Sequence, residues 1–179
     1  MEIRPGIHQI PGLKWSNAFL LVEDSGLTLI NGGLPGDGSK VLNYISRLGH
    51  APQDLQRIIL THSHPDHSAP MKELSRLSGA SITIHLSDTR YRVKTGERWL
   101  HYPGQPPAFD WKLHFFRRIT VHETIEDRQV LPVMGGLQML HTPVAFTSIC
   151  PNTGYCSPET CCWSTGAASD AQSISAEPT

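Results

Sequence analysis

The feature that most constrains this chain is a crowded polar motif directly after an apolar run. Residues 55–60, Leu-Gln-Arg-Ile-Ile-Leu, have the composition of a buried strand, and residues 61–67 read Thr-His-Ser-His-Pro-Asp-His. Three histidines and one aspartate therefore fall within six positions. In extended chain, His62 and His64 are two positions apart, so both side chains project to the same side and can share one ion.

The residue types in this motif favour a metal site. Imidazole and carboxylate groups are ligands of zinc, and they also suit iron and manganese. Asp66 and His67 lie at the mouth of the next predicted helix, where they diverge from the first pair and can serve a neighbouring ion. The alternative is a solvated polar loop, which does not require such crowding of histidines. We therefore predict that His62, His64, Asp66 and His67 are metal ligands.

The segments around the motif predict a layered α/β domain, because strands come first and then alternate with helices. Residues 19–22 and 27–30 are apolar runs joined by Asp-Ser-Gly, which is typical of a β-hairpin. Two helices with one apolar face each are expected to end at Gly49 and Gly79. Further strands are predicted at 82–84, 119–121, 129–133 and 137–140, with irregular chain over 86–116.

Composition narrows the classes of function. The 179 residues, 39% of them hydrophobic, suffice for one domain with its own core. A net charge of -1 does not favour electrostatic binding to nucleic acid or to an anionic membrane. No apolar run approaches the roughly 20 residues that span a bilayer, and residues 1–6 lack the apolar stretch of a secretion signal. We expect a cytoplasmic protein with a small-molecule substrate, and the oligomeric state is left open.

The chain changes in composition near residue 143. All 15 Lys and Arg residues lie between Arg4 and Arg128, and all four cysteines follow residue 149. Residues 144–179 contain eleven Ser and Thr residues and no basic residue. Such a composition is typical of low-complexity, disordered chain. The expected division is a folded domain over 1–143 and a tail over 144–179.

The motif and its surroundings resemble the metallo-β-lactamase superfamily. The resemblance covers residues 1–143 and includes the early hairpin, residues 30–33 (Ile-Asn-Gly-Gly), the histidine motif and residues 140–143 (Leu-His-Thr-Pro). It implies the first half of a four-layer αββα fold, with a site for one or two metal ions between the sheet edges. His62 and His64 would hold the first ion, and Asp66 and His67 the second.

The same resemblance implies the chemistry. In such sites a hydroxide shared by two metal ions attacks a carbonyl carbon while the ions stabilise the oxyanion. The implied activity is hydrolysis of an ester, thioester or lactone, with zinc as the expected metal and iron or manganese as alternatives. Asp66 would be both a ligand and the group that orients the hydroxide. The alternatives from other classes are a non-catalytic metal-binding partial domain and an iron-dependent oxidoreductase of the same superfamily.

Three departures from the family sequence predict impaired activity. Asn31 stands where the family usually has an aspartate that supports the site, so ligand orientation is expected to be weaker. Val144 follows Pro143 where the family continues Gly-His, and that histidine normally completes the first metal site. The bridging Gly-Asp and a later histidine have no counterpart, so most of the second half of the fold is missing. A half-fold is also expected to expose an apolar sheet face.

The composition of residues 144–179 also suggests a reading-frame change. Back-translation of 155–164, read two bases later, permits Leu-Leu-x-Gly-Asp-x-Leu-Leu-Val, which resembles the family's strand that ends in Gly-Asp. The alternative is a natural disordered tail. We predict that the coding DNA near codon 143 contains a small deletion or misjoined boundary, and that the shifted frame recovers Gly-Asp. DNA sequencing tests this, and a stop codon before any Gly-Asp in that frame would exclude it.

Overall fold

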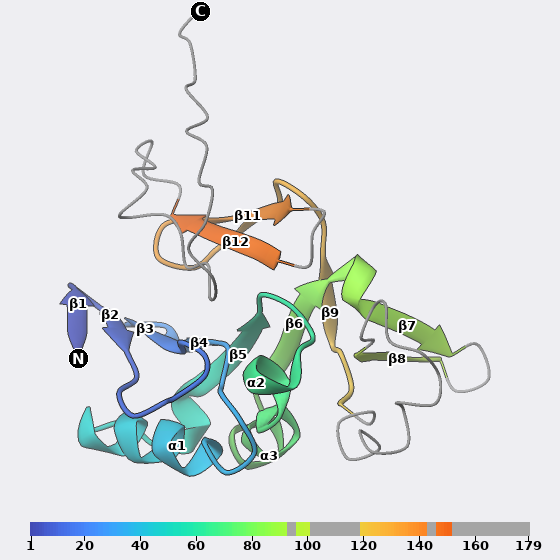
Figure 1. Ribbon diagram of the computed structural model, residues 1–179. Coiled ribbons are helices and arrows are strands. Elements are labelled where there is room, and N and C mark those ends of the chain that lie inside the picture. Colours follow the sequence, from blue (N-terminus) through green and yellow to red (C-terminus); the bar gives the residue numbers. More distant parts are fainter. Residues whose placement is uncertain (93–95, 101–118, 143–145, 152–179) are drawn as a thin grey trace, which may run out of the picture.

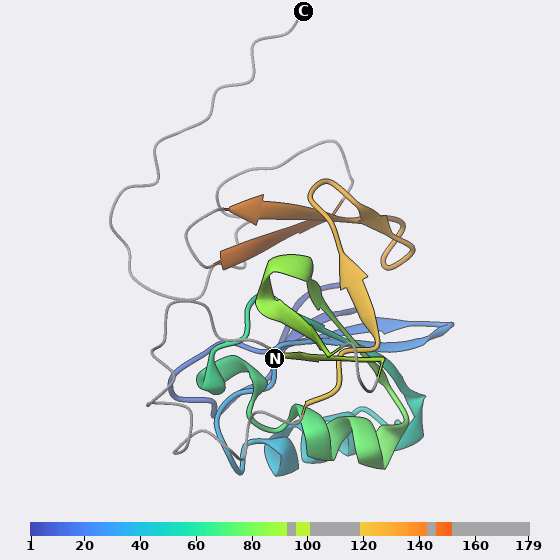
Figure 2. The same cartoon turned by 90° about the vertical axis from the view of Figure 1, so that its right-hand side faces the viewer.

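The computed structural model describes residues 1–92, 96–100, 119–142 and 146–151. Three layers stack on one another in these ranges (Figures 1 and 2). A seven-stranded sheet forms the middle layer, with helices against one face and a three-stranded sheet over the other. This mixed arrangement of sheets and helices matches the α/β fold that the sequence predicts.

The central sheet places the ends of its parallel strands at one edge. Its order is β1-β2-β3-β4-β5-β6-β9, and pairing is antiparallel from β1 to β4 and parallel from β4 to β9. The strands are β1 (Glu2–Arg4), β2 (Ile7–Gln9), β3 (Phe19–Glu23), β4 (Gly26–Ile30), β5 (Leu55–Leu60), β6 (Ser81–His85) and β9 (Glu123–Ile125). The predicted hairpin is confirmed as β3 and β4. In parallel sheets, the carboxyl ends of the strands are the usual place for binding sites.

Two amphipathic helices connect the parallel strands. They are α1 (Gly38–Arg47), between β4 and β5, and α3 (Met71–Ser78), between β5 and β6. The predicted helix end at Gly79 is confirmed, because this residue caps α3 with a φ of 81°, a left-handed conformation that suits glycine. The short elements are α2 (Pro65–Ser68) and the 3₁₀ turns η1 (Pro52–Asp54) and η2 (Leu86–Asp88).

Alternation along β5 divides its side chains between two cores. Ile58 and Leu60 point to the helical side, and Ile59 points to the opposite face of the sheet. Val41 and Ile45 of α1, together with residues of α3, complete the core on the helical side. Burial on both faces explains why residues 58–60 form a continuous apolar run.

The second core corrects the expectation of an exposed sheet face. This face of the central sheet is covered by a small sheet of β10 (Val130–Leu131), β11 (Leu137–Thr142) and β12 (Phe146–Pro151), in that order. The buried members of this core come from the central sheet and from residues 125–139: Ile7, Phe19, Leu21, Ile30, Ile59, Ile125, Leu131, Val133, Leu137 and Met139. The apolar face is therefore covered by this chain's own second sheet over these residues.

Two predictions of local structure are wrong. Residues 89–100 were expected to be irregular, but β7 (Thr89–Arg92) and β8 (Glu97–Leu100) form an antiparallel hairpin. The strand predicted at 119–121 instead lies at 123–125, where β9 pairs with β6. The Ile119 carbonyl accepts from the amide of Leu100 at 3.2 Å, so that segment bonds to β8 rather than to the central sheet.

Strand β12 also begins inside the segment that composition assigns to the tail. Residues 146–151 pair with β11 over six residues, from Thr142↔Phe146 to Leu137↔Pro151. Cross-strand bonds can hold a segment whose composition lacks a strand period, because the backbone supplies them. The remaining predicted tail, 152–179, and part of the predicted irregular segment, 101–116, lie outside the described residues. Within the described chain, no helix is long and apolar enough to cross a membrane.

Gly32 provides a test of how tightly the β4 edge packs on α3. A Cβ at this position would overlap Met71 Cε and would lie 3.0 Å from Pro70 Cγ. We predict that Gly32→Ala lowers the free energy of unfolding by about 1–3 kcal/mol, because the buried Met71 must move. Urea unfolding measures this cost. In a Met71→Ala background the same substitution should cost less, and an equal cost in both backgrounds would contradict the packing argument.

Candidate metal centre

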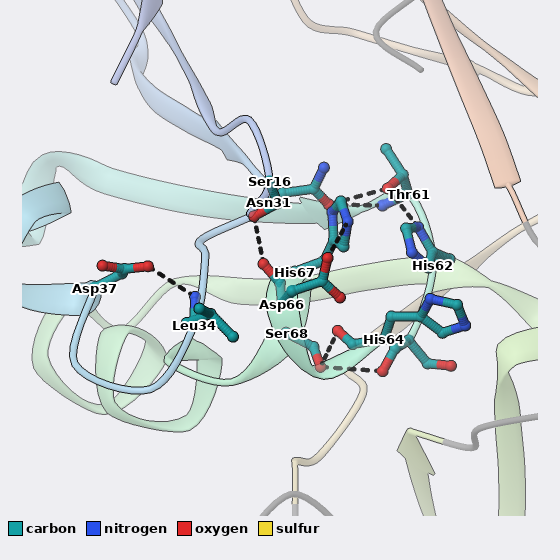
Figure 3. A network of polar contacts seen from close by, with 11 residues as sticks. Ser16, Asn31, Leu34, Asp37, Thr61, His62, His64, Asp66, His67 and Ser68 are labelled. Atoms are coloured by element: carbon teal, nitrogen blue, oxygen red, sulfur yellow. Dashed lines mark hydrogen bonds and ion pairs between the residues drawn. The ribbon is translucent and has the colours of Figure 1, made fainter. Parts of the chain in front are cut away.

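The histidine motif forms a tight turn at the carboxyl end of β5. His64 immediately precedes α2, and its carbonyl accepts from the amides of His67 and Ser68, both at 3.0 Å. The Ser68 hydroxyl donates to the carbonyls of Ser63 and His64, at 3.1 and 3.0 Å. Pro65 suits the first position of the helix because the amide there has no helical partner. These bonds stabilise the turn between β5 and α2, so that the four predicted ligands lie close together (Figure 3).

The structure brings the four predicted ligands together. The ring of His62 lies between the other two imidazoles, with centroid distances of 4.4 Å to His64 and 4.1 Å to His67. Asp66 Oδ2 lies 3.2 Å from His67 Nε2. His62 and His67 are each only 2% exposed, whereas the Asp66 side chain is 30% exposed. The assignment of these side chains to two separate ions stays a prediction.

The donor chemistry of this cluster fits a cation, although its geometry does not converge on one. Within the described ranges, no group of three or more His, Cys, Asp and Glu side chains is arranged to hold a metal ion. Burial lowers the pKa of His62 to about 3 and of His67 to about 4, and neighbouring histidines add to both effects. Burial also lowers the pKa of His64. Neutral imidazole is the state in which histidine binds metal ions.

A buried hydrogen-bond chain links Asn31, Thr61 and His62. The side-chain oxygen of Asn31 accepts from the amide and the hydroxyl of Thr61, both at 3.1 Å, and Thr61 Oγ1 lies 3.0 Å from His62 Nδ1. If the single hydroxyl proton goes to Asn31, the Thr61 oxygen accepts from Nδ1–H of His62, and this is the tautomer that we predict. The lone pair of that imidazole is then on Nε2, the nitrogen that could bind a metal ion.

Asn31 therefore supports the motif through an amide oxygen rather than the carboxylate that is usual in the family. It is 1% exposed, and its φ of 59° is a left-handed conformation that asparagine tolerates. The main-chain amide of Asn31 donates to the carbonyl of Ile59 at 2.9 Å, and this bond joins the end of β4 to β5. The expected weakening of ligand orientation by this residue remains a prediction.

Two residues beside the motif were missed by the sequence reasoning. Asp88 is 7% exposed, and its Oδ1 accepts from the amide of Ser63 at 3.1 Å. Ser16, in the loop before β3, donates its hydroxyl to the carbonyl of Asp66 (Figure 3). Asp88 follows the parallel strand beside β5, so the rule that such strand ends share one edge could have found it. Ser16 carries no comparable signal, because it lies 50 positions from its partner.

Comparison with known proteins identifies the family. The model of the metallo-beta-lactamase superfamily matches residues 13–150, and this chain belongs to that superfamily. It is 35% identical over 141 residues to the uncharacterized protein YobT of Bacillus subtilis (strain 168), a match covering 74% of this chain and 56% of that protein. It is 36% identical over 63 residues to a hydroxyacylglutathione hydrolase of Shewanella pealeana, covering 35% of this chain and 22% of that enzyme.

Solved structures show the same fold. The metallo-beta-lactamase GOB-18 of Elizabethkingia meningoseptica superposes with a TM-score of 0.66 at 20% identity, covering 83% of this chain and 54% of that one. A metallo-beta-lactamase of Cronobacter sakazakii gives 0.64 at 23% identity, covering 83% and 58%. The chain thus spans little more than half the length of these relatives. The family match runs past Pro143, where the sequence resemblance was expected to end.

The tautomer of His62 can be tested in the metal-free chain. We predict that Thr61→Val releases Nδ1 of His62 and converts a single tautomer into a mixture, because valine keeps the shape of threonine and lacks the hydroxyl. Long-range ¹⁵N–¹H correlation spectra of the imidazole report the tautomer directly. Thr83→Val is the matched control, since Thr83 is equally buried on β6 and donates to Glu123 instead. An unchanged His62 spectrum in Thr61→Val would contradict the proposed hydrogen bond between Thr61 and His62.

Proposed function

We propose that this chain is a metal-dependent hydrolase that acts on the carbonyl group of a thioester, ester or lactone. The observation that carries this proposal is the cluster of three imidazoles and the Asp66 carboxylate at the carboxyl end of β5. Membership of the metallo-β-lactamase superfamily supports metal-dependent hydrolysis in general. The type of bond cleaved and the substrate go beyond this general activity and are part of the proposal.

His62, His64, Asp66 and His67 would hold the metal. Zinc is the first candidate, because the set combines three imidazoles with one carboxylate, and iron or manganese can occupy similar sites. A bound divalent cation lowers the pKa of water and polarises a carbonyl oxygen. To bind a cation, the Asp66 and His67 side chains must turn from the direct contact that they now make with each other at 3.2 Å.

The chain's own residues orient the reaction. The Asn31–Thr61 pair holds His62 with Nε2 as the nitrogen available to a cation. The Asp66 side chain is 30% exposed, so its carboxylate can reach both a cation and an incoming water molecule. In this role it accepts a hydrogen bond from the attacking water and aims it at the carbonyl carbon.

A thioester is the substrate class to test first. The name hydroxyacylglutathione hydrolase, carried by one relative, describes the cleavage of an acyl group from the sulfur of glutathione. That match covers 35% of this chain, so the inference extends to the bond type and not to the glutathione part. The second candidate function is metal binding without turnover, which is favoured by Ala145 at the position where the family has its next histidine ligand.

Metal binding provides the first test of the proposed function. After treatment with a chelator, the chain should bind zinc, and His62→Ala should weaken binding at least about 10-fold, because the ion loses a ligand. Competition with a chromophoric chelator measures the affinity. His50→Ala is the control, because His50 lies beyond α1 and contacts Asp54. Zinc affinity that is equal in the wild type and His62→Ala would contradict this ligand assignment.

Turnover separates the two candidate functions. We predict that the zinc-loaded chain hydrolyses at least one member of a panel of acyl thioesters, aryl esters and lactones, and that chelation abolishes this activity. Asp66→Asn should reduce kcat more than it reduces zinc affinity, because the amide orients water less well than a carboxylate. Tight zinc binding with no turnover on the panel would instead support the non-catalytic function.

A further inference from the structure

We infer that Asp88 is a positioning residue for His62 and His64, because its carboxylate holds the peptide group between them. The inference rests on the proposed metal site only for its functional consequence. Its structural basis is a contact between two segments that are 25 positions apart in the sequence. Asp88 lies at the end of η2, and its Oδ1 accepts from the amide of Ser63 at 3.1 Å.

Sheet topology brings these two segments together. Strands β5 and β6 are parallel neighbours, paired from Arg57↔Ser81 to Leu60↔Ile84. The turns after them therefore emerge at the same edge. Residue 63 lies three positions beyond the end of β5, and residue 88 lies three positions beyond the end of β6. The register of β5 and β6 therefore places Asp88 beside the histidine motif.

Both peptide groups of Ser63 are held. Asp88 accepts from its amide, and the Ser68 hydroxyl donates to its carbonyl at 3.1 Å. The orientation of His62 relative to His64 depends on the backbone dihedral angles of these two peptide groups, which the two bonds restrict. The two bonds therefore fix the orientation of His62 relative to His64, which a shared ion requires.

The burial of Asp88 indicates that this contact is more than an incidental surface bond. A buried carboxylate is costly unless hydrogen bonds or opposite charges compensate it. Its Oδ2 accepts from the Ser87 hydroxyl at 3.2 Å, and in the described part of the chain no Lys or Arg forms an ion pair with it. The negative charge acts on the motif, because Asp88, together with Asp66, opposes the lowering of the His64 pKa by burial.

Two substitutions separate the hydrogen bond from the side chain as a whole. Asp88→Ala removes the acceptor, whereas Asp88→Asn keeps an oxygen that can accept from Ser63. The matched control is Asp54→Ala, because Asp54 also accepts from a main-chain amide, that of Ala51 at 2.8 Å. Asp54 lies at the opposite end of β5 from the histidine motif.

The first readout needs no metal. Amide hydrogen exchange, followed by NMR on the metal-free chain, should be at least about 10-fold faster at Ser63 in Asp88→Ala, while amides of β4 and β5 keep their protection. Asp88→Asn should retain most of the protection, and Asp54→Ala should leave Ser63 unchanged. Unchanged exchange at Ser63 in Asp88→Ala would overturn the inference, and so would equal exchange in the alanine and asparagine variants.

The second readout is zinc affinity by chelator competition. Asp88→Ala should weaken binding about 10–100-fold, the range typical of losing a residue that orients a ligand, and Asp88→Asn should weaken it less. An equal loss in Asp54→Ala would overturn the inference, because it would show a general effect on stability. If wild-type chain binds no zinc, the proposed metal function fails, while exchange at Ser63 still decides whether Asp88 positions the loop.

Discussion

The parallel pairing of β4, β5 and β6 is the constraint on which the rest of this structure depends. Because the three strands run in one direction, Asn31, the histidine motif and Asp88 all emerge at the same edge. Main-chain bonds then join the ends, as in the donation from the Asn31 amide to the Ile59 carbonyl. A shift of one residue in either register would turn alternate side chains to the other face and separate these groups.

Burial on both faces makes that register specific. The helices cover one face of the central sheet, and β10 to β12 cover the other. Ile58 and Ile59 must therefore point in opposite directions, and no slip satisfies both cores. The sheet can then hold the His62 ring with its centroid 4.4 Å from that of His64 and 4.1 Å from that of His67, with the His62 and His67 side chains buried.

The sequence predicted the elements whose signals are local. The hairpin of β3 and β4, the helix end at Gly79 and the strand at 55–60 each have a turn residue or apolar period within a few positions. Prediction from the sequence failed where the pairing of strands, rather than the local sequence, determines where a strand lies. Strand β9 lies at 123–125 rather than 119–121 because it must reach β6, and β12 forms because β11 offers a partner.

The sequence by itself determined the candidate ligands and the family, because His62, His64, Asp66 and His67 lie close together along the chain. Only the tertiary structure decided what surrounds them. The acceptor of Thr61 comes from 30 positions away and the acceptor of Ser63 from 25. The family resemblance placed Asn31 near the site, but only the structure shows its bond to Thr61 and the bond between Asp88 and Ser63. A hydrogen bond depends on distance in space, and here the register of three parallel strands sets that distance.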